Sequence, residues 1–518
     1  QHPTNLRSTL CAARPASPPT NRSVADRGEM RLPSVVTAGW LAVILCCFVL
    51  VASAADEECS GSPNSTPFSM VNLIERKRDG RELTTAEITA MVQKFTSGEV
   101  PEYQITAMLM AIYFRGMTEA ETAALTIAFT NSGDRMDLSS LGIPAADKHS
   151  TGGVGDKVSL VLAPLASSCG LAVPMMSGRS LGHTGGTLNK LEAIPGMRTN
   201  LSSSEILSQL SDIGVAVFGA TSTIAPVDKK VYRLRDQTGT TKSLSLITSS
   251  IMSKKIAEGT KSLVLDVKSG RGALLSKVEE CIELAQSMVK AGEEAGVRSV
   301  ALITDMSQPL GEAVGNWVEV QEAIAVMHGA GPSDVRTLVV EECAQMLLLS
   351  GLASSLQQAR GMANANLDNG KAFEKFKAMV QAQGGDVAAV VSPEKVPPAA
   401  HVRSVRVATG GFVAAIDALR VAEIGHRLAG GAAAAEADGK AGVLVRKKVG
   451  ERVEDGGEVA VLLGSDKEGV EREVEAMLGV FEIQPTAPLQ EHVPTLISYI
   501  VTAAGAKEWG EYLREAGL

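Results

Sequence analysis

The sequence is poor in aromatic residues and has few cysteines. Phe, Trp and Tyr together make up 3% of the 518 residues, whereas the chain contains 50 glycines and is 45% hydrophobic. This composition is typical of a globular α/β protein rich in small residues, and it argues against a disordered chain. The 7 cysteines form no CxxC pair and no metal-ligand spacing, so neither a disulfide framework nor a zinc site is indicated.

No long run of basic residues is present. The formal net charge is -9, from 58 acidic and 49 basic residues, and the two signs are mixed along the chain. Binding to a nucleic-acid backbone requires a broad basic surface, so nucleic acid is not an expected partner. A small anion needs only a few local donors, so this class of ligand stays open.

The N-terminal part has the order of a secretory signal. Its first methionine, Met30, is followed by an arginine, an apolar stretch and an Ala-Ser-Ala at 52–54. We therefore predict a leader and signal-like segment over residues 1–54, with a secreted or organellar protein if it is used and a cytoplasmic one otherwise. No stable membrane association is expected after its removal. A membrane anchor is the alternative, but the apolar run from Gly39 to Ala55 is short for a spanning helix of about 20 residues.

Helical patterns separated by turn signals fill the stretch from Met70 to Phe129. Thr84 with Glu87 is a plausible N-cap pair, and the whole stretch predicts a small helical bundle. From about Lys148, short apolar runs alternate with helix-like stretches, which indicates buried parallel strands in βαβ units. The expected strands are VSLVLAPLASSCG, LAVPMMS, VAVFG, SLVLDVKSG and RSVALITDMS, and the helix-like stretches include 202–212 and 276–291.

The chain changes character again after a proline-marked linker at 392–398. Short Val-rich strands with glycine-bearing turns predict an α+β domain over 399–518. The fold class expected for the whole is therefore α/β, with a small all-helical domain, a large α/β domain with a mixed, mainly parallel sheet, and the C-terminal α+β domain.

The first of two glycine-rich turns is KHSTGGVGDKVS, at 148–159. Its glycines allow the backbone to approach a ligand and to turn successive N–H groups inward. Lys148 adds a positive charge, and Ser150 and Ser159 add hydroxyl donors. The pattern is neither a GxGxxG fingerprint nor a Walker loop. Taken alone, it is either a structural turn or a site for phosphate or carboxylate.

The second turn, SGRSLGHTGGTLNKLE at 177–192, directly follows the expected strand LAVPMM. It supplies Ser177, Thr187 and a glycine pair before Thr187. Ligands in open α/β sheets bind at the carboxyl ends of strands, so two such turns on neighbouring strands would converge there. We expect them to enclose one oxyanion from two sides.

In these blocks the chain resembles the thymidine and pyrimidine-nucleoside phosphorylase family. The family segment K-H-S-T-G-G-V-G-D is unchanged at 148–156, and the family signature S-G-R-G-L-x-x-T-G-G-T-x-D-x-L-E is matched at 177–192. A third block appears as Arg235-Asp236 followed by LITSSIMSKK at 246–255. The resemblance runs from about Ser69 into the C-terminal domain.

Two positions depart from the family signature. Ser180 stands where the family has glycine, and Asn189 stands where it has aspartate. Asparagine keeps the shape of the aspartate but loses its charge and gains a donor. We interpret Asn189 as a change that affects rate more than chemistry. His183, inside the same block, is interpreted as structural.

The resemblance implies a role for nine residues. Phosphate is bound by Lys148, Ser150, Ser159, Ser177 and Thr187; the pyrimidine base is held by His149, Arg235, Ser250 and Lys254, of which His149, Arg235 and Lys254 are catalytic. Because Ser250 precedes Lys254 by four positions, both lie on one face of a helix. His149 can donate to O2 of the leaving base as negative charge develops there.

The resemblance also implies how the parts are arranged. The helical domain, 69–140 with 222–258, carries the base site, and the α/β domain, 141–221 with 259–392, carries the phosphate site, with closure bringing them together. No metal and no cofactor are implied, since inorganic phosphate is a co-substrate. A homodimer is expected, with a pyrimidine nucleoside and phosphate as the small-molecule partners.

The function predicted from the sequence is that of a thymidine phosphorylase. It would reversibly convert thymidine or deoxyuridine to the free base and 2-deoxyribose 1-phosphate. An apolar Met175, where uridine-accepting relatives have lysine, favours thymidine. The alternatives are a broader pyrimidine-nucleoside phosphorylase that accepts uridine, a secreted pseudoenzyme that binds pyrimidines, and anthranilate phosphoribosyltransferase, which shares the fold but lacks the S-I-x-x-K-K block.

Overall fold

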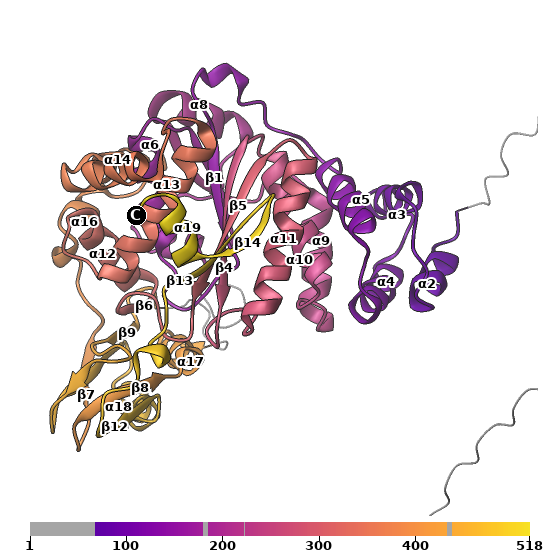
Figure 1. Ribbon diagram of the computed structural model, residues 1–518. Helices are drawn as coiled ribbons and strands as arrows, with labels where there is room; N and C mark the ends of the chain where they lie inside the picture. The colour runs from indigo at the N-terminus through magenta and orange to yellow at the C-terminus, as the bar shows by residue number, and fades with distance from the viewer. Residues whose placement is uncertain (1–67, 180–184, 222, 432–437) are drawn as a thin grey trace, which may run out of the picture. The chain divides into compact units, whose positions relative to one another are not determined.

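The computed structural model describes residues 68–179, 185–221, 223–431 and 438–518 (Figure 1). The signal-like segment predicted over 1–54 lies outside these residues, as do Ser180 and His183. Within the described ranges, no helix is both long enough and apolar enough to span a lipid bilayer.

Six helices make up the helical part of the described chain. Four come from its start and two from the middle of the sequence: α2 (Met70–Arg78), α3 (Thr85–Ser97), α4 (Glu102–Arg115), α5 (Glu119–Thr130), α9 (Pro226–Thr238) and α10 (Leu244–Ala257). The predicted cap is confirmed, because the Thr84 hydroxyl accepts from the Glu87 N–H and the Glu87 carboxylate accepts from the Thr84 N–H. Val231 of α9 and Leu246 of α10 pack in the same core as Phe95 of α3. The chain therefore returns to the bundle after residue 225.

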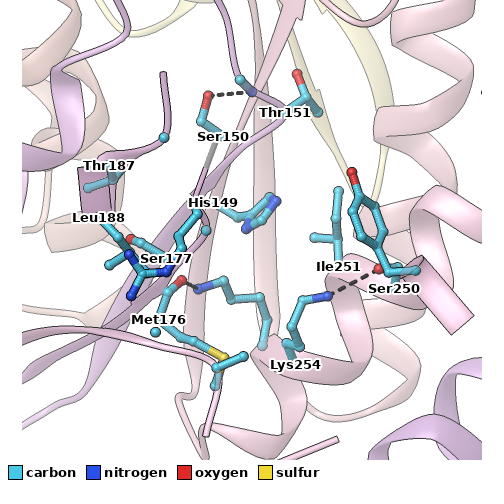
Figure 2. Close-up of a pocket in the computed structure, with 18 of the residues that line it drawn as sticks. His149, Ser150, Thr151, Met176, Ser177, Thr187, Leu188, Ser250, Ile251 and Lys254 are labelled. Atoms are coloured by element: carbon cyan, nitrogen blue, oxygen red, sulfur yellow. Dashed lines mark hydrogen bonds between the residues drawn. The ribbon is translucent and has the colours of Figure 1, made fainter. Parts of the chain in front are cut away.

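The main sheet is mixed and mainly parallel, as predicted. Its order is β1-β4-β5-β13-β14. The strands are β1 (Ala146–Ser150), β4 (Ser262–Ser269), β5 (Arg298–Asp305), β13 (Ile497–Thr502) and β14 (Gly505–Glu508). The strands β1, β4 and β5 pair in parallel, whereas β13 is antiparallel to β5 and β14 is antiparallel to β13. A second parallel pair, β2 (Val173–Ser177) and β3 (Val215–Gly219), adjoins β1 where the Ala146 N–H donates to the Ala172 carbonyl, 3.0 Å away. The carboxyl ends of β1 and β2 border the pocket of Figure 2.

Helices cover both faces of the main sheet. Successive residues of a strand point to opposite faces, and accordingly Leu263 and Leu265 of β4 pack with α11 (Val278–Glu294), whereas Val264 packs with α13 (Ser333–Ser350). Besides α6 (Val158–Ser168), the other helices of the α/β part are α7 (Thr187–Glu192), α8 (Ser203–Ile213), α12 (Asn316–Met327), α14 (Leu356–Asp368), α15 (Lys371–Ala382) and α16 (Val387–Val391). The helix-like stretches expected at 202–212 and 276–291 are confirmed as α8 and α11.

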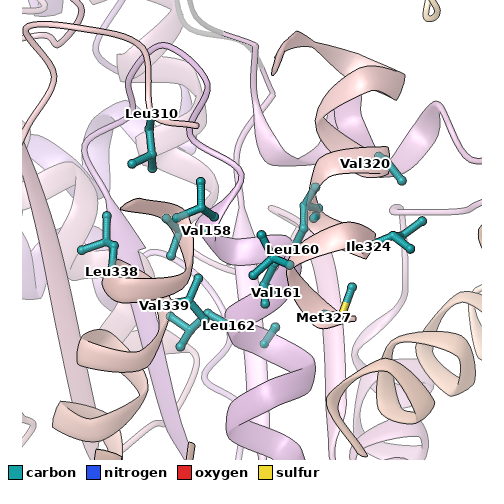
Figure 3. Close-up of a cluster of buried hydrophobic side chains, with 14 of the residues drawn as sticks. Val158, Leu160, Val161, Leu162, Leu310, Val320, Ile324, Met327, Leu338 and Val339 are labelled. Atoms are coloured by element: carbon teal, nitrogen blue, oxygen red, sulfur yellow. The ribbon is translucent and has the colours of Figure 1, made fainter. Parts of the chain in front are cut away.

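One predicted strand is wrong. The apolar run VSLVLAPLASSCG forms helix α6 (Val158–Ser168), and every residue from Val158 to Ser167 is buried. Figure 3 shows its side chains packed among those of α12 and α13. A helix surrounded by protein is apolar on all sides, so it lacks the 3.6-residue period, and a short run of this kind cannot be told from a buried strand by pattern alone.

The C-terminal part contains two antiparallel sheets and then returns to the main sheet. Its elements are β7 (His401–Arg406), β8 (Gly411–Ile416), α17 (Ala418–Leu428), β9 (Gly442–Val445), β10 (Arg452–Val453), β11 (Glu458–Gly464), α18 (Lys467–Leu478), β12 (Phe481–Gln484) and α19 (Trp509–Glu515). The sheet orders are β10-β8-β12 and β6-β9-β11-β7, where β6 (Ala313–Gly315) comes from the α/β part. The expected α+β region is present, but β13 and β14 extend the main sheet beyond β5, so the two parts share strands.

Candidate active site

A cavity of about 480 Å³ lies between the carboxyl ends of β1 and β2 and the helices α9 and α10. All nine residues assigned from the sequence line it. Figure 2 shows His149 in the middle, with Ser177 and Thr187 on one side and Ser250 and Lys254 on the other. Hydroxyl groups and glycines dominate the side with Ser177 and Thr187. Cationic groups dominate the side with Ser250 and Lys254.

The first glycine-rich turn folds back on itself beside the cavity. Gly152 and Gly155 have positive φ angles of 87° and 75°, which side chains disfavour. The Ser150 hydroxyl donates to Asp156 Oδ2 at 2.5 Å and accepts from the Gly152 N–H at 3.0 Å. Asp156 thus holds the turn closed, a role that the sequence reasoning missed although the residue belongs to the quoted motif.

Lys148 lines the cavity, and its side chain belongs to a group of buried charges. Its Nζ lies 3.3 Å from Asp266 Oδ2 and 3.5 Å from Glu342 Oε2, and all three side chains are 0% exposed. Burial alone would lower the pKa of Lys148, but the carboxyl groups of Glu342, Asp156 and Asp266 raise it above its ordinary value. Nζ makes no hydrogen bond to any described protein atom. The ammonium is therefore charged and has donors to offer to an anion.

The second turn is tied to the first by Lys190 of α7. Its Nζ donates to the Asp156 carbonyl at 2.6 Å and lies 2.6 Å from Glu319 Oε2. Thr187 is the first residue of α7, and Ser177 ends β2, so both hydroxyls stand at the cavity edge. Convergence of the two turns, expected from the sequence, is confirmed.

Opposite these turns, Ser250 and Lys254 share one face of α10, as their spacing predicted. Lys254 Nζ donates to Ser250 Oγ at 3.1 Å and to Asp228 Oδ2 at 2.5 Å. The Lys254 side chain is 22% exposed, whereas that of Asp228 is 4% exposed. Asp228, at the start of α9, therefore holds the lysine at the cavity wall, and the sequence reasoning assigned it no role.

Arg235 lines the cavity but already uses much of its guanidinium group. Nη1 donates to the Leu246 carbonyl at 2.9 Å, Nη2 to the Thr241 carbonyl at 2.7 Å, and Nε to the Thr240 carbonyl at 3.3 Å. A guanidinium has five N–H donors, so two remain for a ligand. Arg235 thus joins α9 to the segment that leads into α10, in addition to the base-binding role that the resemblance implies.

His149 lies on β1, opposite Leu265 of β4. Burial lowers the pKa of its imidazole well below the usual value, and the ammonium groups of Lys255, Lys254 and Lys148 lower it further. The ring is therefore neutral at physiological pH, with one N–H donor.

We predict that His149 makes stability depend on pH below about 6.5. Between its low folded pKa and the ordinary unfolded value, the unfolded chain binds a proton that the folded chain does not, so the unfolding free energy falls as the pH falls. Above that window the contribution is constant. Urea unfolding from pH 5 to 8 measures the slope, which should be smaller in His149→Asn; equal slopes in both proteins would contradict a neutral, half-buried His149.

Two sequence arguments have different outcomes here. The hydroxyls and cations named from the motifs are together at one cavity, although the roles given to them stay predictions. Met175, by contrast, is 1% exposed and packs in the α/β core, while its neighbour Met176 lines the cavity. Alternation along β2 directs Met175 away from the cavity, so the reason given for a thymidine preference finds no support in this structure.

Further lining residues carried no assignment from the sequence. They include Asp156, Asp228, Tyr232, Ile251 and Lys255. Lys255 donates to Asp147 Oδ2 at 2.6 Å and to the Met176 carbonyl at 2.9 Å, which joins α10 to β1 and β2. Its place directly after Lys254 in the S-K-K segment was the available signal. Among the described residues, no cluster of His, Cys, Asp or Glu has the arrangement of a metal site.

Comparison with known proteins identifies this combination of a helical bundle and an α/β part. Residues 71–133 match the helical bundle domain of the glycosyl transferase family, and residues 142–373 match its a/b domain. A protein named pyrimidine-nucleoside phosphorylase from Staphylococcus haemolyticus is 43% identical over 435 residues, which cover 84% of this chain and 99% of that protein. Proteins of the same name from Bacillus subtilis and Geobacillus stearothermophilus are each 44% identical over 83% of this chain, covering 99% and 98% of their own lengths.

One solved structure found by comparison is the anthranilate phosphoribosyltransferase from Thermus thermophilus. It is 18% identical, with a TM-score of 0.49, and covers 60% of this chain and 98% of that one. The two matched domains and the cavity between the glycine-rich turns and α10 define a pentosyltransferase. The chain belongs to the pyrimidine-nucleoside phosphorylase family.

Proposed function

We propose that this enzyme catalyses the phosphorolysis of pyrimidine nucleosides. An oxygen of hydrogen phosphate attacks C1′ of the pentose, the C1′–N1 bond breaks, and its electron pair passes to the base. The base then takes up one proton, in balance with the proton that phosphate loses, and the products are the free base and the pentose 1-phosphate. The observation that carries the proposal is one cavity with an anion-binding side and a base-binding side, separated by His149. The printed name of the relatives supports it, and phosphate serves as co-substrate with no cofactor.

The anion side offers donors of several kinds. Lys148 supplies a buried charge without a hydrogen-bond partner among the described protein atoms, and Ser159 lies in the first turn of α6, whose N-cap makes no side-chain hydrogen bond. A helix N-terminus carries partial positive charge and free N–H groups. Together with Ser177 and Thr187, these groups would hold phosphate against C1′ and so align the attack.

The base side stabilises the departing pyrimidine. The neutral imidazole of His149 keeps one N–H group that can donate a hydrogen bond to the base. Lys254 and Arg235 line the same cavity and add positive charge. Negative charge develops on the base as the glycosidic bond breaks, so these donors bind the transition state more tightly than the substrate. No covalent enzyme intermediate is required.

Thymidine and deoxyuridine are proposed as substrates, and the broader alternative that also accepts uridine is supported by the printed name of the relatives. The two groups differ by the 2′-hydroxyl of the sugar. Values of kcat/KM for thymidine, deoxyuridine and uridine decide between them: a preference of 10-fold or less, about 1.4 kcal/mol, would favour the broader specificity.

The test of the reaction itself is thymidine cleavage by the full chain with and without inorganic phosphate, followed by absorbance. Cleavage that requires phosphate and yields a sugar 1-phosphate supports the proposal. Cleavage without phosphate would indicate a hydrolase. Binding of thymine without any cleavage would favour the pseudoenzyme and would make Asn189 the first position to change.

We predict that Asn189→Asp leaves kcat similar or raises it. Asn189 lies in α7, next to Lys190, which connects the two glycine-rich turns. Restoring a carboxylate of the same shape changes one charge beside that connection, and Asn189 itself is not among the residues that line the cavity. Steady-state kinetics of the two proteins measure the effect. A drop in kcat of more than about 10-fold, or 1.4 kcal/mol, would contradict the interpretation.

We further propose that the enzyme is a homodimer formed through α4. Tyr103 is 73% exposed and Phe114 is 75% exposed, and Met110 lies between them at a spacing that places all three on one helical face. Val71 of α2, which packs beside α4, is also exposed. Contiguous exposed apolar surface of this kind is typical of an interface, and a second copy of the chain is the occupant we propose.

Light scattering on a sizing column tests this assembly. The unmutated chain should have twice the monomer mass, and Phe114→Glu should shift the mass toward that of the monomer because a charge at an apolar interface is costly to bury. Leu489→Glu is the matched control, since Leu489 is an apolar residue, 62% exposed, in a loop outside α4. A monomeric mass for the unmutated chain would overturn the assignment.

A further inference from the structure

A lysine ammonium sits in a buried cage of oxygen atoms beside the phosphate side of the cavity. Lys157 Nζ lies 2.8 Å from the Leu310 carbonyl, 2.9 Å from the Ala313 carbonyl and 2.5 Å from Glu322 Oε2. Its side chain is 0% exposed and does not line the cavity. Burial lowers the pKa of Lys157, but Glu322 and Glu319 outweigh it, so the pKa is raised and the group stays charged.

The cage lies against the first glycine-rich turn. A Cβ on Gly155 would come 2.4 Å from the Leu310 carbonyl and 3.3 Å from that of Ala313, the same two oxygens that bind Lys157. The Leu310 N–H also donates to the Val154 carbonyl at 3.0 Å. The glycine is thus required where the turn passes the cage, and the 310–313 segment forms the outer support of the turn.

Glu322 completes the cage and fixes its far side. Its carboxylate accepts from the backbone N–H groups of Glu312 and Ala313, each at 3.0 Å from Oε1. A Cβ on Gly311 would lie 2.2 Å from Glu322 Oε2 and 2.8 Å from Lys157 Nζ. Two carbonyls and a carboxylate converge at one point, and they repel one another unless a cation lies between them.

Lys157 connects this cage to Ser150 and Ser159, the two hydroxyl groups of this turn that are assigned to phosphate. It follows Asp156, which holds the Ser150 hydroxyl, and it is the N-cap of α6, two residues before Ser159. A displacement of Lys157 would therefore move both hydroxyls and the N-terminus of α6 together.

We propose that the ammonium of Lys157 is a built-in cation that fixes the first glycine-rich turn in its phosphate-binding geometry, and that a free ammonium ion can replace it when the side chain is truncated. Lys157 is then a positioning residue, not a catalytic one, since it does not reach the cavity. The proposal rests on the proposed function only in taking phosphate as the ligand of the turn.

The test compares two variants in sodium buffer. Lys157→Ala removes the ammonium and leaves space for a small cation, whereas Lys157→Met removes the charge but fills the space. We expect KM for phosphate to rise about 10-fold or more in both, because small displacements of positioning groups have effects of this size, with KM for the nucleoside little changed. Ammonium chloride should restore Lys157→Ala and raise its melting temperature; it should do neither for Lys157→Met. Tetramethylammonium chloride, which has no N–H donor and is too large, controls for ionic strength.

Several results would overturn the proposal. They are an unchanged KM for phosphate in both variants, an equal rise in both KM values, or no difference between ammonium and tetramethylammonium. If Lys157→Ala folds only with ammonium, the cage is supported directly; if it folds in neither salt, KM for phosphate in Lys157→Met decides. If the unmutated chain shows no phosphate-dependent cleavage, the proposed function fails. The cation role of Lys157 is then tested only by whether ammonium raises the melting temperature of Lys157→Ala and leaves that of Lys157→Met unchanged.

Discussion

Lys148→Ala is expected to lower kcat/KM for phosphate by about 10³-fold, since removal of one preorganised charged donor from a water-poor site costs this much. The ammonium is buried, charged and without a hydrogen-bond partner among the described protein atoms. Its attraction for a phosphate oxygen is not weakened by water in such a site. Steady-state kinetics with phosphate varied at saturating nucleoside measure the loss, and KM for the nucleoside should change little.

The same substitution also affects stability, because Lys148 faces Asp266 and Glu342 in the interior. Lys268 remains 2.5 Å from Asp266 Oδ2, so Asp266 keeps a cationic partner when Lys148 is removed, and burial raises the pKa of Glu342 well above its usual value. We therefore expect a loss of about 3 kcal/mol or less in unfolding free energy, at the lower limit for breaking a buried pair. Kinetics must be measured well below the melting temperature.

Two further variants separate the charge of Lys148 from general damage. Lys148→Arg keeps the charge but not the compact ammonium, so it should recover part of the activity. Lys261→Ala removes an exposed lysine just before β4, outside the cavity lining, and should leave both KM values unchanged. A loss in Lys148→Ala that fell equally on phosphate and nucleoside would assign Lys148 a structural role only.

The sequence predicted the parts of the site that depend on local pattern. The glycine-rich turns at Gly152 and Gly186, their meeting at the strand ends and the shared helix face of Ser250 and Lys254 all follow from short-range rules of backbone and spacing. The parallel strands of the main sheet could be predicted as well, because runs such as SLVLDVKSG are apolar on both faces, as strands covered on two sides must be. The antiparallel strands β13 and β14 could not, since their residues were assigned to the C-terminal domain.

What the sequence could not give depends on contacts between distant segments. Lys157 meets Leu310 and Glu322 across more than 150 residues, and no pattern near Lys157 indicates that its charge is buried. For α6 the failure is of another kind, since a helix without a polar face has no period to detect. The direction of the Met175 side chain depends on which face of β2 meets the cavity. Alternation along a strand divides its side chains between two faces but does not tell which face borders the cavity.

Arg235→Ala is expected to lower both stability and nucleoside affinity. The side chain is 2% exposed, and its guanidinium binds the carbonyls of Thr240, Thr241 and Leu246. Removing a charged donor leaves these carbonyls without their partner and opens a cavity, so we expect about 3 kcal/mol or more of lost unfolding free energy. Urea unfolding measures this loss.

The kinetic effect of Arg235→Ala follows from the same contacts. The segment that Arg235 holds leads into α10, which carries Ser250 and Lys254, so a loosened segment misplaces the base side of the cavity. We expect kcat/KM for the nucleoside to fall about 10²-fold, while KM for phosphate, whose proposed ligands lie on β1, β2, α6 and α7, changes little. Lys148→Ala would thus lose activity toward phosphate and Arg235→Ala toward the nucleoside, which would distinguish the anion side of the cavity from the base side.

Arg233 provides the matched control on the same helix. Its side chain is 56% exposed and pairs with Glu102 at the surface, so Arg233→Ala should change the unfolding free energy by no more than about 0.5 kcal/mol and leave kinetics intact. Arg235→Lys keeps the charge but loses the planar fork that reaches three carbonyls, and it should recover little of the stability. If Arg235→Lys restored full nucleoside affinity, charge at the base would be the dominant contribution of Arg235, and its hold on the segment before α10 would be secondary.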